Sequence, residues 1–159
     1  MDKVMTIFLI DDDPFYLMLA GEELSKNTNF KVHKFSTGED ALIYSKIQPD
    51  LILIDFHLNG KIPKAKNGDI IAKRFKDKCP DSEIMILTSD HKLSMMQELG
   101  GANNQKFHIK GDDNNLLGVR IIKHKLKSRL YDFQIDRMTK VTGLCSMLLI
   151  VLVIIFVNS

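Results

Sequence analysis

The sequence predicts an α/β protein with a doubly wound, five-stranded parallel sheet, followed by one apolar helix. Short apolar runs alternate with longer amphipathic runs along residues 4–127. Strands that alternate with helices in this way form a parallel sheet with helices on both faces. The seventeen residues from Val141 to Val157 contain no charge. A length of 159 residues leaves room for one ordinary domain and this appendage.

The predicted strands are the five short apolar runs, and the first and third are apolar enough to be buried on both faces. They cover residues 4–10, 30–35, 50–54, 83–87 and 106–109. The amphipathic runs that follow them are the predicted helices, at residues 14–26, 38–47, about 69–78, 92–99 and 112 to about 129. Asp13 and Pro14 mark the start of the first helix, because Asp is a good N-cap and Pro suits the first helical position.

Composition narrows the class of protein. The net charge of +2 is too small to indicate a nucleic-acid partner. Cys79 and Cys145 form no metal-binding or disulfide pattern, which favours free thiols in a reducing compartment. No signal peptide precedes the first strand, so we expect the N-terminal part to stay in the cytoplasm.

Polar residues stand where the predicted strands end. Asp11, Asp12 and Asp13 follow the first strand, Asp55 the third, Thr88 the fourth and Lys110 the fifth. The carboxyl ends of parallel strands meet at one edge of a sheet, which is where ligands bind. Clustered carboxylates repel one another, so a chain that keeps them usually has a cation to hold. Carboxylates together with water suit Mg²⁺.

These residue types fit phosphoryl transfer. Asp55 would be the nucleophile that forms an acyl phosphate. Thr88 would hydrogen-bond a phosphoryl oxygen, and Lys110 would pair with the phosphate after transfer. Metal, hydroxyl and lysine would together neutralise the charge that spreads over the transferring group.

From residue 5 to about residue 127 the chain resembles the receiver domains of two-component response regulators, which have a flavodoxin-like fold. The resemblance implies Mg²⁺ held by Asp11, Asp12, Asp55 and the backbone carbonyl of His57, with Asp55 as phosphoacceptor. It implies Thr88 as the switch hydroxyl, Phe107 as the switch aromatic and Lys110 as the invariant lysine. Asp13 is left as the cap of the first helix.

The chain departs from the family pattern in two places. Gly111 follows Lys110 where the family has a proline, and glycine does not lock the backbone as proline does. The loop after Asp55 carries an insertion with Lys61, Lys64 and Lys66, so that Gly68 is the glycine that matches the family pattern.

The resemblance also implies partners. A sensor histidine kinase or a histidine phosphotransfer protein would supply the phosphoryl group, and an unidentified downstream protein would receive the signal by contact. The chain would catalyse only its own phosphorylation and dephosphorylation, so it is not an enzyme in the usual sense. Phe15 and Met18 lie off the helix stripe of Leu17, Ala20 and Leu24, where they would either meet a partner or pack laterally.

The apolar run predicts a membrane anchor. We assign residues 1–127 to the receiver, 128–140 to a basic juxtamembrane helix or linker, and 141–157 to a transmembrane helix. The basic residues before the run fit the positive-inside rule, which predicts a single-pass tail anchor in the inner (cytoplasmic) membrane with the receiver in the cytoplasm. Thr142 and Ser146, four residues apart, are a weak signal for a homodimer.

Two other functions stay open. Gly111 and the altered loop favour a degenerate receiver that acts as a constitutive membrane adaptor. A phosphatase resembling the haloacid dehalogenase class would use Asp11 as its nucleophile, followed by Asp13, Thr88, Lys110 and the acidic pair Asp112-Asp113. That class needs its last acidic pair on a separate strand, whereas here the pair follows Lys110 almost at once.

Overall fold

The computed structural model describes residues 4–58, 66–88, 106–109 and 116–157. For residues 106–109, 133–134, 137 and 149–157 it describes the backbone alone. The chain divides into two compact units, Met1–Ile121 and Ile122–Ser159. The predicted boundary of the receiver at residue 127 stays a prediction.

The first unit is built on a five-stranded sheet. Its strands are β1 (Met5–Ile10), β2 (Phe30–Phe35), β3 (Leu51–Asp55), β4 (Glu83–Thr88) and β5 (Lys106–Ile109). They lie in the order β2-β1-β3-β4-β5, and every neighbouring pair is parallel. The predicted doubly wound sheet is confirmed. Its strand order reverses between β1 and β3, which is the switch point where such sheets bind ligands.

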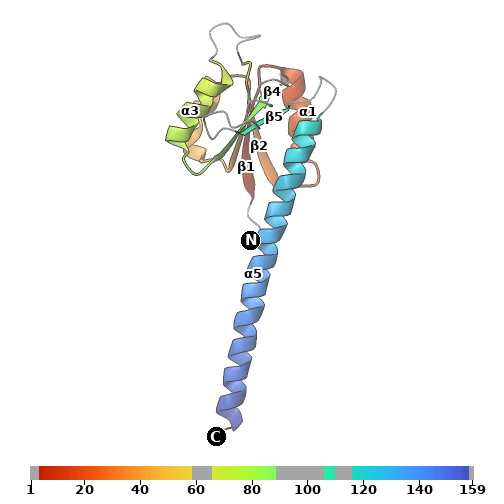
Figure 1. The fold of residues 1–159 in the computed structure, drawn as a ribbon, viewed down its shortest axis with the longest axis vertical. Helices are drawn as coiled ribbons and strands as arrows, with labels where there is room; N and C mark the ends of the chain where they lie inside the picture. The colour runs from red at the N-terminus through yellow and green to blue at the C-terminus, as the bar shows by residue number, and fades with distance from the viewer. Residues whose placement is uncertain (1–3, 59–65, 89–105, 110–115, 158–159) are drawn as a thin grey trace. The chain divides into compact units, whose positions relative to one another are not determined.

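The described helices are α1 (Pro14–Ser25), α2 (Gly38–Ile43), α3 (Gly68–Lys78) and α5 (Leu117–Val157). Figure 1 shows α1 and α3 on opposite sides of the sheet. Two layers of helix therefore cover the central strands, as the alternating sequence pattern predicts. The helix predicted at residues 92–99 lies outside the described residues.

The core follows the alternation of side chains along each strand. Phe8 and Ile10 of β1 are fully buried in the cluster formed with Ile71 and Phe75 of α3. The intervening Ile7 is buried as well, and successive strand side chains point to opposite faces. Apolar side chains on both faces explain why the central strands are continuous apolar runs in the sequence.

Helix α1 buries the stripe that the sequence predicts. Leu17, Ala20 and Leu24 are buried, whereas Phe15 is 53% and Met18 44% exposed. The exposed pair therefore does not pack laterally within the described part of the chain. A partner that contacts these two side chains stays a prediction.

Several helix boundaries differ from the prediction. The predicted helix 38–47 stops at Ile43, and a 3₁₀ turn follows at Ser45–Ile47. Gln48, the residue before Pro49, then takes a left-handed conformation with a positive φ of 52° and ends the turn. The last helix begins at Leu117 rather than at residue 112.

Helix α5 runs for 41 residues without a break. At about 1.5 Å per residue, its last seventeen residues extend over about 26 Å. Within the described part of the chain, no helix combines the length and the apolar character needed to cross a membrane. The predicted span at residues 141–157 falls partly outside the described side chains, which end at Leu148.

Candidate functional site

The strand register brings the acidic residues together. Ile10 of β1 lies opposite Ile54 of β3. The residues that follow these two, Asp11 and Asp55, are therefore neighbours at the carboxyl edge of the sheet. Their proximity follows from the register of two adjacent parallel strands.

Three carboxylates form one cluster. Asp11, Asp12 and Asp55 each offer a carboxylate oxygen, and these oxygens all lie within 4.8 Å of one another. Asp11 is fully buried and Asp55 is only 5% exposed. The backbone N–H of Asp13 donates to Oδ1 of Asp11 at 2.9 Å, which helps to orient that carboxylate.

Asp13, the third acidic residue after β1, caps helix α1. Its Oδ1 accepts from the backbone N–H of Phe15 at 3.0 Å and of Tyr16 at 3.5 Å. It is the N-cap of α1, and Pro14 takes the first helical position. The prediction that Asp13 caps the helix is confirmed.

Thr88 belongs to the same edge. Asp55 lies opposite Leu87 in the β3–β4 pair, and the backbone N–H of Phe56 donates to the carbonyl of Leu87 at 2.8 Å. Thr88 is the next residue and is fully buried. The fourth strand therefore ends in a buried hydroxyl on the strand next to the one that carries Asp55.

The remaining predicted site residues are only partly described. Phe107 lies in β5, next to Ile86 of β4, but its side chain lies outside the described residues. Lys110, Gly111, Lys61 and Lys64 also lie outside them. His57 is exposed just beyond β3, and its backbone carbonyl as a metal ligand stays a prediction.

The donor set fits Mg²⁺. Three carboxylates, two of them almost fully buried, share a small volume at the switch point of the sheet. Burial and like charge both disfavour the ionised forms unless a cation is present. Mg²⁺ prefers oxygen ligands and is usually held by a few carboxylates together with phosphate oxygens and water. Asp11, Asp12 and Asp55 would hold it here.

Gly68 contacts the backbone of the β3 end. Its N–H donates to the carbonyl of Phe56 at 3.0 Å. A Cβ built on Gly68 would meet the carbonyl oxygen of Asp55 at a distance that real Cβ atoms do not reach. The position predicted to match the family glycine therefore has a steric need for glycine.

Gly68→Ala should destabilise the first unit by about 1–3 kcal/mol, as overpacking usually does. It should also slow any reaction at Asp55, because the backbone that holds this carboxylate must shift. Urea unfolding and the rate of acetyl phosphate labelling measure the two effects. Gly21→Ala is the matched control, since its Cβ would meet only the flexible Lys34 side chain. Equal labelling rates in both variants would contradict the positioning role of Gly68.

Tyr16 is a site neighbour that the sequence pattern did not reveal. It lies in the first turn of α1 and is only 5% exposed. Burial raises the pKa of its phenol, and the negative charges of Asp11 and Asp55 raise it further. The phenol therefore stays protonated beside the carboxylates at neutral pH. The sequence signal that could have indicated this place is a hydroxyl-bearing aromatic residue four positions after Asp12, one of the clustered carboxylates.

The raised pKa of Tyr16 predicts a loss of stability in alkali. The folded state holds the phenol proton above the ordinary pKa of 10.0, whereas the unfolded state releases it there. The free energy of unfolding should therefore fall above pH 10, by at most about 1.4 kcal/mol per pH unit for this proton. Tyr16→Phe should lose less stability over the same range in urea unfolding. Equal slopes in both proteins would contradict the prediction.

Comparisons with known proteins agree with this architecture. Residues 7–121 match the response regulator receiver domain family. No curated protein sequence matches the chain. The solved structures similar to this one include a BeF3-activated DrrB receiver domain, which is 21% identical with a TM-score of 0.58 over 82% of this chain and 99% of that chain.

Two other similar structures have the same fold. A CheY-like receiver domain protein from Methanospirillum hungatei JF-1 is 19% identical, with a TM-score of 0.58 over 84% of this chain and 99% of that one. A response regulator protein from Burkholderia pseudomallei, determined with a phosphorylated aspartic acid, a calcium ion and citrate, is 18% identical. Its TM-score is 0.55 over 84% of this chain and 72% of that one. Since the family match covers residues 7–121, most of the sequence, this chain belongs to the response regulator receiver domain family.

Proposed function

We propose that this chain is a response regulator receiver that accepts a phosphoryl group on Asp55 and is held at a membrane by α5. The observation that supports phosphorylation is the cluster of Asp11, Asp12 and Asp55 at the switch point, with buried Thr88 on the adjacent strand. A sensor histidine kinase or a histidine phosphotransfer protein would be the donor, and the output would be contact with another protein.

Each residue of the site has a role in the proposed reaction, and Asp55 has two, because it would also be a ligand of Mg²⁺. A carboxylate oxygen of Asp55 forms a bond to phosphorus while the phosphorus–nitrogen bond to the donor histidine breaks, and the imidazole leaves with a proton. Asp11 and Asp12 hold Mg²⁺, which when bound supplies positive charge beside the phosphoryl oxygens. The hydroxyl of Thr88 donates a hydrogen bond to a phosphoryl oxygen, and the ammonium of Lys110 pairs with the phosphate.

The switch would involve Thr88 and Phe107. If the Thr88 hydroxyl moves toward the new phosphoryl oxygens, it vacates space beside β5, the strand that carries Phe107. A hydrogen bond to a charged phosphoryl group is strong enough to bias such a two-state element.

The experiment that tests phosphorylation is incubation of the full chain with Mg²⁺ and acetyl phosphate, followed by mass spectrometric mapping of the labelled aspartate. Label on Asp55 that depends on Mg²⁺ supports the proposal. Label on Asp11 instead would indicate the phosphatase class. A folded protein that takes no label from acetyl phosphate or phosphoramidate would favour the constitutive adaptor, the alternative that Gly111 suggests.

The membrane anchor is supported by residues 141–157. The run is uncharged, it ends a continuous helix, and basic residues precede it. A helix of about 17 residues is at the lower end of the length that spans a hydrocarbon core. Cations before the run would contact anionic headgroups, at about 1 kcal/mol for each one near the surface. The receiver would then lie on the cytoplasmic side of the membrane.

A further inference from the structure

The part of α5 before the apolar run carries an exposed apolar stripe. Tyr131 is 64%, Ile135 47% and Met138 64% exposed. The stripe continues with Thr142 and Cys145, which are exposed as well. The spacing along these five residues alternates between four and three, which is the heptad pattern of a two-stranded coiled coil.

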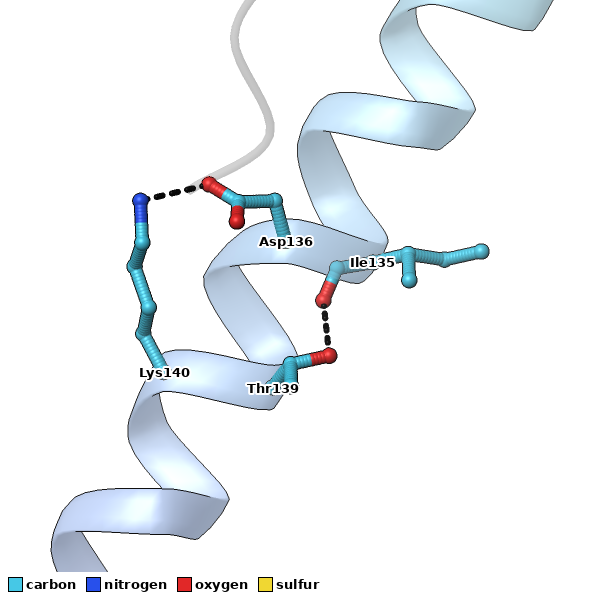
Figure 2. A network of polar contacts seen from close by, with 4 residues as sticks. All are labelled: Ile135, Asp136, Thr139 and Lys140. Atoms are coloured by element: carbon cyan, nitrogen blue, oxygen red, sulfur yellow. Dashed lines mark hydrogen bonds and ion pairs between the residues drawn. The ribbon is translucent and has the colours of Figure 1, made fainter.

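The opposite side of the same helix is charged. At about 100° per residue, the stripe residues fall within an arc of about 80°, and Asp136 and Lys140 lie roughly opposite its centre. Figure 2 shows these two residues in an ion pair, with Nζ of Lys140 2.6 Å from Oδ2 of Asp136. Ile135 points away from that pair (Figure 2). Among the described side chains of residues 131–140, the apolar residues and the Asp136–Lys140 ion pair therefore lie on different sides of the helix.

The hydroxyl groups near the stripe are satisfied within the helix. Oγ1 of Thr142 donates toward the carbonyls of Met138 at 3.1 Å and Thr139 at 3.0 Å. Oγ1 of Thr139 donates to the carbonyl of Ile135 at 2.9 Å (Figure 2). These side chains need no water, so they can face an apolar surface at little cost.

The charges next to the stripe indicate which partner would cover it: a second copy of the same helix in parallel. With Ile135 and Thr142 at a positions and Tyr131, Met138 and Cys145 at d positions, Lys127 is a g residue and Asp132 is the following e residue. In a parallel dimer the g residue of one helix meets the next e residue of the other helix. Opposite charges would therefore meet twice, once on each side of the two-fold axis.

The same two residues are poor partners within one helix. Lys127 and Asp132 are five residues apart, and only residues three or four apart are neighbours on a helix surface. Both are exposed. Their charges are complementary across a parallel pair of helices, and an antiparallel pair would not bring them together in this register.

We infer that two copies of this chain pair in parallel through α5, with Tyr131, Ile135, Met138, Thr142 and Cys145 in the seam. The pairing rests on α5 alone and does not depend on phosphorylation of Asp55. It continues toward the apolar run through Thr142 and Ser146, small residues that let two helices approach closely. The dimer would hold two receivers together through the paired helices, which would double the local concentration of the output surface.

The native cysteines provide a direct test. Cys79 is buried, and burial raises the pKa of its thiol, so it should react slowly. Cys145 is exposed and lies in the seam, where a parallel dimer brings it beside its own copy. Treatment of the full chain in mild detergent with copper phenanthroline and oxygen should therefore give a disulfide-linked dimer. Cys145→Ser should abolish this product.

Two further variants make the test specific for the seam. In the Cys145→Ser background, Met138→Cys should cross-link rapidly, whereas Lys140→Cys, two residues away on the charged side, should not. Equal cross-linking at both places would indicate random collision in the micelle and overturn the proposal. A monomer at every protein concentration in analytical ultracentrifugation would overturn it too. The stripe would then be expected to contact a lipid surface instead of a second helix.

A charge exchange tests the parallel arrangement. Lys127→Glu and Asp132→Lys should each weaken the dimer several-fold, because like charges would then face each other across the seam. The double variant should restore wild-type affinity. Failure of the double variant to recover would contradict the register. Labelling of Asp55 should be the same in all these proteins, so the outcome is independent of the proposed phosphorylation.

Discussion

Asp55→Asn should reduce labelling by acetyl phosphate to the background of the assay, whereas Asp13→Asn should keep most of it. Asp55 is the carboxylate that ends β3 within the cluster, and an amide in its place is a much weaker nucleophile. Asp13 is the nearest matched control. It caps α1, and asparagine caps a helix as well as aspartate does.

The measurement is the extent of label in the presence of Mg²⁺, with circular dichroism to establish that each variant is folded. Asp12→Ala should also lose most of the rate and its dependence on metal, since it removes one of the three clustered carboxylates. In the proposed reaction Mg²⁺ lies beside the acceptor, so chelation should stop wild-type labelling. Label that persists in Asp55→Asn would place the acceptor elsewhere.

Truncation after Lys127 should move the protein from the membrane to the soluble fraction. The full chain should resist carbonate extraction from membranes, because its apolar run would be buried in hydrocarbon. The truncated chain keeps the whole first unit and the buried Ile122 and Leu126. It should therefore still accept phosphate on Asp55.

Charged substitutions separate anchoring from mere loss of the helix. Leu148→Lys with Val151→Lys should release the full-length chain, since each lysine near the bilayer centre costs about 2.5–3.5 kcal/mol. Ser128→Lys adds one positive charge ahead of the run rather than within it, and should leave the protein in the membrane. If the wild-type full chain appears in the soluble fraction without detergent, residues 141–157 must instead be covered by protein.

The sequence predicted the sheet well because its signals there are local and repeated. The bounds predicted for β2 and β5 match the structure, and the other strands agree within one residue. The parallel, doubly wound arrangement followed from general rules for alternating strands and helices, whereas the strand order β2-β1-β3-β4-β5 came from the structure. The helix predicted at residues 38–47 is α-helical only to Ile43, because its last residues form a 3₁₀ turn, which an amphipathic sequence pattern does not distinguish from an α-helix.

The sequence predicted that the carboxylates of the candidate site meet at one edge of the sheet, and the structure confirms this, but the sequence did not predict which other side chains surround them. Asp11, Asp12 and Asp55 are recognisable because charge at the end of an apolar run is unusual. Tyr16 was missed, since a sequence pattern does not say which buried hydroxyl faces the carboxylates. The steric need at Gly68 was also invisible, because it comes from contact with a backbone carbonyl more than ten residues earlier.

The carboxylate cluster has an evolutionary consequence. Buried like charges lower the stability of the unliganded domain, so replacing Asp11 or Asp55 by a neutral side chain of similar size relieves repulsion. Loss of the reaction would then be accompanied by a gain in stability, and random substitution would tend to remove the cluster from a receiver that had no use for it. A constitutive adaptor would be free to drift in that direction. A cluster of three carboxylates at this edge is therefore the arrangement expected of a chain that uses Asp55 for phosphorylation, and an adaptor would not need it.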